Sequence, residues 1–333
     1  MRKIILGSNL RARVLSVLAV CATACALAGC GGSTPSITAA EQPLSKETMS
    51  MLGRKGMDSQ APIFVRIFKE ESELEVWKAR DDGRFYHFKT YPICNWSGNV
   101  GPKTTLGDKQ APEGFYRVAN SQMNPNSQYY LAFNLGYPNA YDRALQRTGD
   151  ALMVHGKCKS AGCYAMTDGL IEEIYALARE TFDGGQSSFE VHAYPFRMTD
   201  ANMARHIGAK WHDFWQVLKE GHDYFELTRQ PPPVVVCGRR YHVNAKPIRT
   251  VANRTDPAGV CPALERLPLS PFTPPKDQQT ADSRFIAPGP KRRSIDVAGG
   301  ASGGSPPGVM QGLMKSLTPA GSGGTALGLS QTD

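Results

Sequence analysis

The composition of the two ends of the chain restricts any fold to its middle. Residues 251–333 are rich in Pro, Gly, Ser and Ala, with runs such as PLSPFTPP and GGASGGSPPG. A segment of this composition cannot bury enough apolar area to offset the entropy lost on ordering it. We therefore predict a disordered tail at 251–333 and a single folded domain over about residues 62–250, out of 333.

The N-terminus predicts export and a lipid anchor. Basic residues at positions 2, 3, 11 and 13 precede an apolar run over 14–27, as in a secretory signal. This run is too short to cross a bilayer as a stable anchor. It ends in Leu-Ala-Gly before Cys30, which matches a bacterial lipobox, although an ordinary signal with a chance cysteine is the alternative.

The lipobox interpretation divides this end of the chain into two parts. We expect a signal peptide at 1–29, then an acylated Cys30 that begins a flexible tether at 30–61. Because Gly31 follows Cys30, we expect the periplasmic face of the outer membrane in a Gram-negative cell. That compartment permits disulfides.

Five cysteines remain in the mature chain after Cys30, and an odd number leaves at least one thiol unpaired. Pairing Cys94 with Cys158 and Cys237 with Cys261 is one arrangement, and it leaves Cys163 free. The sequence alone does not fix this connectivity.

The middle of the chain predicts a mainly β fold with a few helices. Segments 63–68, 74–78 and 85–91 alternate apolar and polar residues, as half-buried strands do. From Leu170 the apolar spacing changes to three and four residues, with Thr167 and Asp168 before it and two glycines at 184–185 after it. Further strands are expected in APEGFYRV, YYLAFNL, ALMVHG, SFEVHAY, VVVCG and RYHVN, and a second helix around 211–218.

The segment 155–169, HGKCKSAGCYAMTDG, gathers residues that permit three hypotheses. A metal site would use His155, Cys158 and Cys163 with Cys94 as a fourth ligand. Structural zinc sites usually use paired ligands at close spacing, and the mature chain has no Cys-x-x-Cys. We therefore expect no metal and no other cofactor, while a disulfide through Cys158 stays compatible with catalysis.

The third hypothesis is a nucleophile with its base. Cys163 follows Gly162 and lies just before a predicted helix, where backbone N–H groups can converge on one point. His155 ends an apolar strand and could take the thiol proton. Ser160 could fix the turn or donate to an oxyanion. An inert buried thiol is the alternative.

These residues carry a resemblance to a known family. His155-Gly156 followed by Ser160-x-Gly162-Cys163 resembles the signature of the L,D-transpeptidase catalytic domain (YkuD). The stretches ICNWSGNVGPKTTLGDKQAPEGFY, NPNSQYYLAFNLGYPNAYD and YPFRMTDANM are similar to its YafK-type subgroup, also called DpaA. The resemblance implies an L,D-transpeptidase-type β-sandwich, with Cys163 as nucleophile, His155 as general base, Gly156 as the residue whose carbonyl orients it, and Gly162 and Ser160 in the catalytic turn.

Two positions depart from the family pattern. Ala161 stands where the family usually has His or Thr, and Ala165 stands where it has Arg or Asn. Arg197 could supply the missing cation or form a structural salt bridge. Four further residues could line a substrate groove or simply lie in surface loops: Lys103, Tyr137, Asn139 and Tyr141.

The resemblance implies cysteine-dependent acyl transfer on peptidoglycan stem peptides that contain a diamino acid, in cell-wall remodelling and cell shape. A hydrolase that releases an outer-membrane lipoprotein or a stem residue is the alternative, because the subgroup includes such a member. A wall-binding lipoprotein without turnover is a third possibility. The expected partners are stem peptides, such a lipoprotein and the membrane through the lipid, and no nucleic acid. Transfer and hydrolysis use the same residues, so the sequence does not choose between them.

Overall fold

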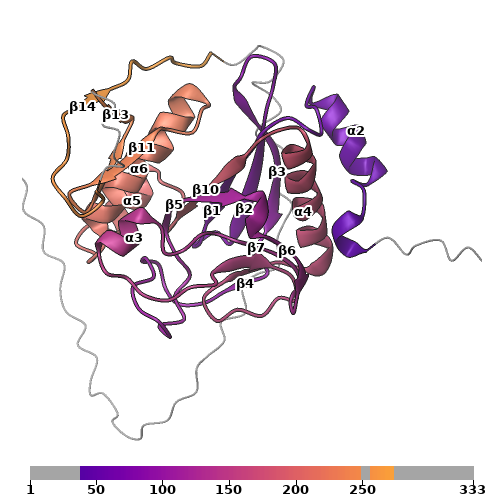
Figure 1. The fold of residues 1–333 in the computed structure, drawn as a ribbon, viewed down its shortest axis with the longest axis horizontal. Coiled ribbons are helices and arrows are strands. Elements are labelled where there is room, and N and C mark those ends of the chain that lie inside the picture. The colour runs from indigo at the N-terminus through magenta and orange to yellow at the C-terminus, as the bar shows by residue number, and fades with distance from the viewer. Residues whose placement is uncertain (1–37, 249–255, 274–333) are drawn as a thin grey trace, which may run out of the picture. The chain divides into compact units, whose positions relative to one another are not determined.

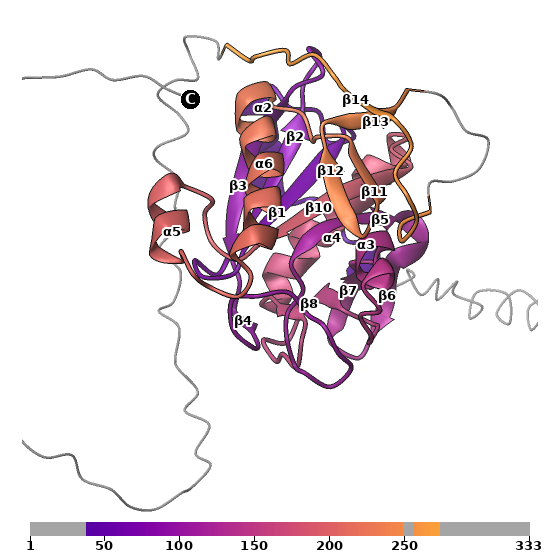
Figure 2. The ribbon, with the colours of Figure 1, turned by 90° about the vertical axis from the view of Figure 1, so that its left-hand side faces the viewer.

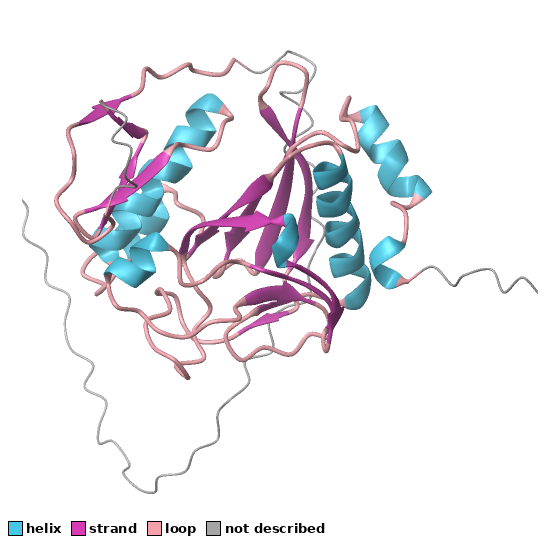
Figure 3. Ribbon diagram, viewed as in Figure 1, coloured by secondary structure: helices cyan, strands magenta, loops and turns pink. Residues whose placement is uncertain are grey.

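The computed structural model describes residues 38–248 and 256–273 (Figure 1). These residues form strands with a few helices, which confirms the fold class expected from the sequence (Figure 3). The predicted signal peptide, the acylated Cys30 and most of the predicted tail lie outside the described residues. Within the described part of the chain, no helix has the length and apolar character needed to cross a membrane.

The larger layer is a five-stranded sheet with the order β3-β2-β1-β10-β5. Strands β1 and β10 run parallel, and the other neighbours are antiparallel. The predicted strands at 63–68, 74–78 and 85–91 correspond to β1, β2 and β3. The bounds are β1 (Ile63–Phe68), β2 (Glu73–Ala79), β3 (Phe85–Pro92), β5 (Gly114–Ala119) and β10 (Ser188–Tyr194).

The second sheet carries the candidate catalytic residues and has the order β4-β9-β8-β7-β6. Its central strands β8 and β9 run parallel. The sequence analysis missed β6, because its residues MNPNS are mostly polar and contain a proline, which removes a backbone donor. The bounds are β4 (Asn95–Trp96), β6 (Met123–Ser127), β7 (Tyr130–Asn134), β8 (Met153–His155) and β9 (Tyr164–Ala165).

Two long helices cover the larger sheet from opposite sides (Figures 1 and 2). Helix α4 (Asp168–Asp183) follows Thr167, ends at Gly184 as predicted, and buries Ile174 and Leu177 in the core shared with both sheets. Helix α6 (His212–Thr228) places Phe225 against Phe64 on the other face, with ring centroids 4.7 Å apart. Coverage on both faces explains why β1 is buried throughout, rather than half-buried as its alternation suggested.

The N-terminal boundary differs from the sequence prediction. Residues 46–54 form helix α2 (Lys46–Arg54), which begins after Ser45 and follows the short 3-10 turn η1 (Ala39–Glu41). Leu52 is buried in the core, and Thr48 Oγ1 donates to Glu173 Oε1 at 2.9 Å. The interpretation of residues 30–61 as a flexible tether is therefore wrong for residues 45–54, because apolar and polar contacts hold them against the domain.

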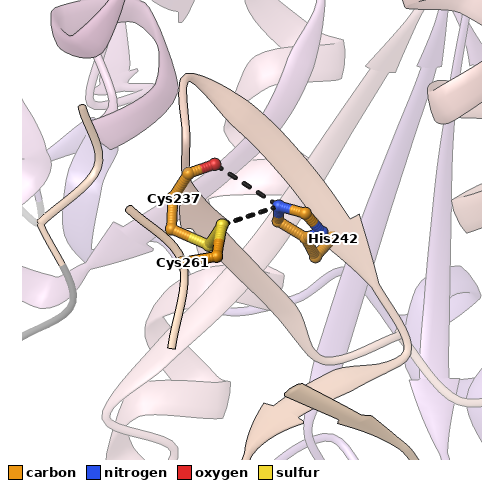
Figure 4. A group of neighbouring side chains, drawn as sticks. All are labelled: Cys237, His242 and Cys261. Carbon is orange, nitrogen blue, oxygen red and sulfur yellow. Dashed lines mark hydrogen bonds between the residues drawn. A yellow bond between two sulfur atoms is a disulfide. The ribbon is translucent and has the colours of Figure 1, made fainter. Parts of the chain in front are cut away.

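The C-terminal boundary also lies further along the chain than predicted. Strand β13 (Ala245–Pro247) pairs with β14 (Leu264–Arg266), and a disulfide joins Cys237 to Cys261 (Figure 4). Residues 256–266 therefore belong to the folded part, which corrects the prediction of a tail that begins at 251. The remaining elements are the predicted hairpin β11 (Val234–Cys237) and β12 (Arg240–Val243), the short helices α3 (Ala140–Ala144) and α5 (Asp200–Arg205), and the 3-10 turn η2 (Asn120–Gln122).

Candidate active site

His155 and Cys163 lie at neighbouring positions of two adjacent parallel strands. His155 ends β8 and pairs with Ala165 of β9, and Cys163 directly precedes β9. Since Val154 pairs with Tyr164, the register places Cys163 opposite Met153, whose amide lies 3.4 Å from the Cys163 Sγ. Alternation then puts the side chains of His155 and Cys163 on one face of the sheet, with Cα atoms about 8 Å apart at ordinary strand spacing.

The imidazole of His155 is oriented by the backbone that follows it. Its Nδ1 lies 2.7 Å from the carbonyl oxygen of Gly156, and this oxygen can only accept. Nδ1 therefore carries the proton, and Nε2 is left with the lone pair that a general base needs. Burial lowers the pKa of His155 against the opposing effect of the Gly156 hydrogen bond, so the ring is neutral at pH 7.

The thiol of Cys163 is free and partly buried. Burial raises its pKa, while the Met153 amide and the charge of Lys103 act in the opposite direction. Within the described residues no hydrogen bond joins this thiol to His155, and its own proton points to Ala151 O at 3.7 Å. The lowered pKa of His155 and the raised pKa of Cys163 both favour a neutral imidazole beside a neutral thiol in the resting site.

The turn before Cys163 is fixed by Ser160. The Ser160 hydroxyl donates to the Cys163 carbonyl at 2.7 Å and accepts from the Gly162 amide at 3.3 Å. Gly162 has a φ of +125°, which favours glycine. Of the two roles considered for Ser160, the structure shows the one that holds the turn.

Gly156 is required by space rather than by conformation. A Cβ atom at this position would lie 2.6 Å from Asp168 Oδ1 and 2.9 Å from the carbonyl oxygen of Tyr129. The Gly156 amide also donates to this Tyr129 oxygen at 3.0 Å. The hairpin that contains Tyr129 can therefore approach the residue after His155 only because that residue has no side chain.

Tyr129 is a site residue that the sequence analysis missed. Its ring lies against the imidazole of His155, with centroids 4.6 Å apart, and the residue is 43% exposed. It sits in the polar stretch NPNSQYY, where nothing local marks it. Only the β6–β7 pairing places it beside His155.

Lys103 and Tyr137, which we considered for a substrate groove or for surface loops, are both buried. The Lys103 ammonium bonds Asp108 Oδ1 at 2.5 Å, and its charge acts on the Cys163 thiol. Burial by itself would raise the pKa of Asp108, but the hydrogen bonds from Lys103 and nearby amides lower this pKa to about 2. The Tyr137 hydroxyl donates towards the carbonyl oxygens of Lys103 at 3.4 Å and Thr148 at 3.3 Å. Tyr137 therefore holds the segments that contain Lys103 and Thr148 together.

The other three proposed substrate-binding residues have structural contacts instead. Arg197 forms ion pairs with Glu73 and with Glu75, the latter at 2.8 Å. Asn139 begins helix α3 by accepting from the Asp142 amide at 2.9 Å. Tyr141 is buried and stacks on Tyr241 with centroids 4.2 Å apart. For Arg197 these contacts are the structural salt bridge considered above, and for Asn139 and Tyr141 they are structural contacts within the fold.

Both candidate metal-ligand groups contain disulfides. Cys158 is bonded to Cys94, so the group around His155 loses two of its four candidate ligands. A second group places Cys237, His242 and Cys261 with ligand atoms within 4.8 Å of one another (Figure 4). Its two sulfurs are joined to each other, and a bridged sulfur does not offer the thiolate that zinc requires.

Comparison with known proteins identifies the family of this chain. Residues 64–191 match the L,D-transpeptidase catalytic domain. The chain is 44% identical over 237 residues to the Escherichia coli K12 protein YafK, provisionally named an L,D-transpeptidase. The match covers 71% of this chain and 92% of YafK. The chain belongs to the L,D-transpeptidase family.

The same match is found with YafK of E. coli O157:H7. Among solved structures, the chain is 20% identical to the Campylobacter jejuni protein Pgp2, described as helical cell shape determining, with a TM-score of 0.33. This match covers 53% of the chain and 62% of the Pgp2 chain. For Bd1075 of Bdellovibrio bacteriovorus the identity is 20% and the TM-score 0.30, over 50% of the chain and 58% of Bd1075.

Proposed function

We propose that this member of the family is a cysteine acyltransferase that acts on diamino-acid-containing peptidoglycan stem peptides through a thioester at Cys163. The observation that carries the proposal is the pairing of β8 with β9. It sets His155, with its Nε2 available as a base, on the same face as the thiol of Cys163. The two disulfides leave Cys163 as the free cysteine among the described residues.

The neutral resting pair defines how the reaction starts. His155 Nε2 takes the thiol proton as the Cys163 sulfur bonds to the carbonyl carbon of the amide at the L-centre of the diamino acid. The Cys163 amide is our candidate donor to the oxyanion, because the Gly162 amide is directed to Ser160. When the C–N bond breaks, His155 returns the proton to the leaving amine, and the thioester remains.

The fate of the thioester decides the product class. An amine acceptor gives a new cross-link or a new lipoprotein attachment, whereas water gives hydrolysis and release. Our preference for transfer follows the family, and YafK shares its provisional transferase name. Hydrolysis is the alternative outcome of the test below, with the same nucleophile and the same base.

The proposal includes a location outside the cytoplasm. A signal at 1–29 and an acylated Cys30 would hold the domain at the periplasmic face of the outer membrane, within reach of the wall. Substitution Cys30→Ser is expected to release the protein into the soluble fraction and to abolish incorporation of labelled palmitate. Membrane retention of this variant, without label, would contradict the lipid anchor.

The decisive experiment incubates the protein with purified sacculi and separates the released muropeptides by mass spectrometry. We expect new diamino–diamino cross-links or new amine adducts with the wild type, and none with Cys163→Ala. Loss of attached lipoprotein remnants without new cross-links would assign hydrolysis instead. No change in the muropeptides, with a folded protein and a known substrate of the family added, would contradict the proposed function.

A further inference from the structure

One end of the disulfide Cys94–Cys158 lies between His155 and Cys163 in the sequence. Cys158 is in the loop that leads from His155 to Cys163, and its sulfur is bonded to Cys94, 64 residues away in sequence. Cys94 precedes β4, and its amide donates to the carbonyl oxygen of Ala165 at 2.9 Å. The bond therefore links the loop that follows His155 to the pair of β4 with β9, the strand that follows Cys163.

The loop that this disulfide holds has an unfavourable backbone. Lys157 and Cys158 have φ values of +63° and +51°, and neither is a glycine. A left-handed conformation is unfavourable for a residue with a side chain, and such residues persist where their surroundings fix them. Two hydrogen bonds contribute here, from the Lys157 amide to Asp168 Oδ1 at 2.8 Å and from the Cys158 amide to Met166 O at 3.1 Å.

The same contacts bear on the position of His155. The Met166 amide donates to the His155 carbonyl at 2.7 Å, while Met166 O accepts from Cys158. The Asn95 side chain also reaches Cys158 O, at 3.5 Å. His155, Cys158 and the start of the β9–β4 pair thus form one closed network in which the disulfide is the covalent link.

We propose that the Cys94–Cys158 disulfide is a positioning element of the active site, which fixes the return loop so that the Nε2 of His155 can reach the thiol of Cys163. This inference rests on the roles proposed above for His155 and Cys163. Without the bond, the loop at 157–158 relaxes towards ordinary φ values, and the base and the nucleophile lose their register. The core of the domain, formed by other residues, stays folded.

The second disulfide provides a matched control. Cys237–Cys261 has the same chemistry, but it joins the end of β11 to the segment before β14, and the Cys261 sulfur contacts His242 (Figure 4). None of the described hydrogen bonds of Cys237, His242 or Cys261 involves residues 155–163. Removing this bond tests the general effect of losing a disulfide.

The experiment compares Cys94→Ser/Cys158→Ser with Cys237→Ser/Cys261→Ser in the full chain, each with and without His155→Ala. The readouts are the rate of Cys163 alkylation by iodoacetamide from pH 6 to 10, kcat and KM. We expect the first pair of substitutions to lower kcat by about tenfold or more, with KM less affected, because small misplacements of reacting groups have effects of this size. We also expect His155→Ala to slow alkylation of Cys163 in the wild type and in the Cys237→Ser/Cys261→Ser control. In the Cys94→Ser/Cys158→Ser variant, adding His155→Ala should not change the alkylation rate.

Reduction gives a second test on one protein. In the Cys237→Ser/Cys261→Ser variant, dithiothreitol transfers two electrons and two protons to the Cys94–Cys158 disulfide and closes into its own cyclic disulfide. We expect activity to fall on reduction and to return when oxidised glutathione re-forms the bond, with unchanged circular dichroism throughout. Mass spectrometry would confirm that the bond re-formed is Cys94–Cys158 and that Cys163 is still free.

Three outcomes would overturn the proposal. They are a kcat within about twofold of the wild type after loss of Cys94–Cys158, an equal loss in the control variant, or unfolding of the reduced protein, which would show a global structural role. Alkylation needs no peptidoglycan, so its coupling to His155 is measured even if sacculi give no products. Failure of this inference is therefore distinguishable from failure of the proposed function.

Discussion

The ring of Tyr129 packs against the imidazole of His155, with centroids 4.6 Å apart. The tyrosine comes from the β6–β7 hairpin and the histidine from the end of β8, so the second sheet itself creates the contact. Because burial is the main cause of the lowered pKa of His155, Tyr129 is a group through which that pKa can be tested.

We predict that Tyr129→Ala raises the pKa of His155 towards its ordinary value of about 6.5, because water then reaches the imidazole ring. Activity should fall most below pH 7, where more of the base becomes protonated. The loss should stay below the roughly 10²–10⁴-fold that a general base typically contributes, since His155 is still present. An NMR titration of His155 measures the shift, and Tyr129→Phe, which keeps the ring, should leave it unchanged.

The pH dependence of the wild type follows from the two neutral groups. The productive form has an unprotonated His155, so kcat/KM should rise with pH through the pKa of His155, which burial lowers from its ordinary value. Alkylation of free Cys163 should instead keep rising into the alkaline range, because burial raises the pKa of the thiol. Rapid alkylation at pH 6 that does not depend on pH would indicate a preformed thiolate and contradict this description.

The same lowered pKa affects folding stability. His155 binds a proton more readily in the unfolded chain than in the folded one, so the free energy of unfolding rises with pH in this range. The contribution is fully present above the ordinary histidine pKa of about 6.5 and is lost as the pH falls through the lowered folded-state pKa. Urea unfolding at pH 5 and pH 7.5 should show a smaller difference in stability for His155→Gln than for the wild type.

Sequence patterns predicted the parts of this fold that depend on local periodicity. The spacing of Ile174 and Leu177 identified α4, and Thr167 and Gly184 marked its ends because caps are local signals. The residues brought together by β8–β9 pairing were also predictable, since His155, Ser160 and Cys163 lie within nine residues of each other. In these cases the information is contained in neighbouring positions.

The rest depended on tertiary contacts that a single sequence does not show. Helix α2 has a cap at Ser45, but its neighbours resemble linker sequence, and its contact with Glu173 is long-range. Tyr129 is brought to His155 by a hairpin of polar residues. Local sequence could not decide whether Arg197 supplies the cation missing beside Cys163 or forms a structural salt bridge, because its partners Glu73 and Glu75 lie on β2, far away in sequence.

Ser160 offers a test of the catalytic turn. We predict that Ser160→Ala lowers kcat roughly fivefold, because the lost hydrogen bond to the Cys163 carbonyl is worth about 1 kcal/mol. Ser97→Ala is the matched control, since it removes the 3.3 Å contact between the Ser97 and Ser160 hydroxyls and leaves the turn bonds in place. Equal kcat values for both variants and the wild type would show that the turn holds its shape without Ser160.

Lys103 tests the electrostatic contribution to the thiol. Its charge lowers the pKa of Cys163 against the larger effect of burial, so Lys103→Met should shift the alkylation profile of Cys163 to higher pH. Lys103→Arg should move it less, because it keeps the positive charge. The exposed Lys109, on the same loop, provides the control Lys109→Met, and a shift as large as that of Lys103→Met would mean that the loop rather than the charge is responsible.

The ion pair between Lys69 and Glu113 connects stability to the site. Both side chains are fully buried, with Lys69 Nζ 3.0 Å from Glu113 Oε1, and Lys69 also donates to the carbonyl oxygens of Asn99, Gly101 and Ala111. These contacts hold residues 97–113, the loop whose Ser97 touches the catalytic turn at Ser160. The pair therefore holds, from the core, a loop that contacts Ser160.

We predict that Glu113→Gln lowers the free energy of unfolding by about 3–5 kcal/mol, because the buried ammonium of Lys69 loses the charge that balances it. Urea unfolding measures this change. Glu265→Gln removes the exposed pair with Lys246, whose side chains are 47% and 55% exposed, and should cost less than about 1 kcal/mol. A loss at Glu113 no larger than at Glu265 would show that the neutral amide satisfies Lys69 as well as the carboxylate does. A larger loss of stability at Glu113 together with a raised KM would show that the Lys69–Glu113 pair also positions the loop that contacts Ser160.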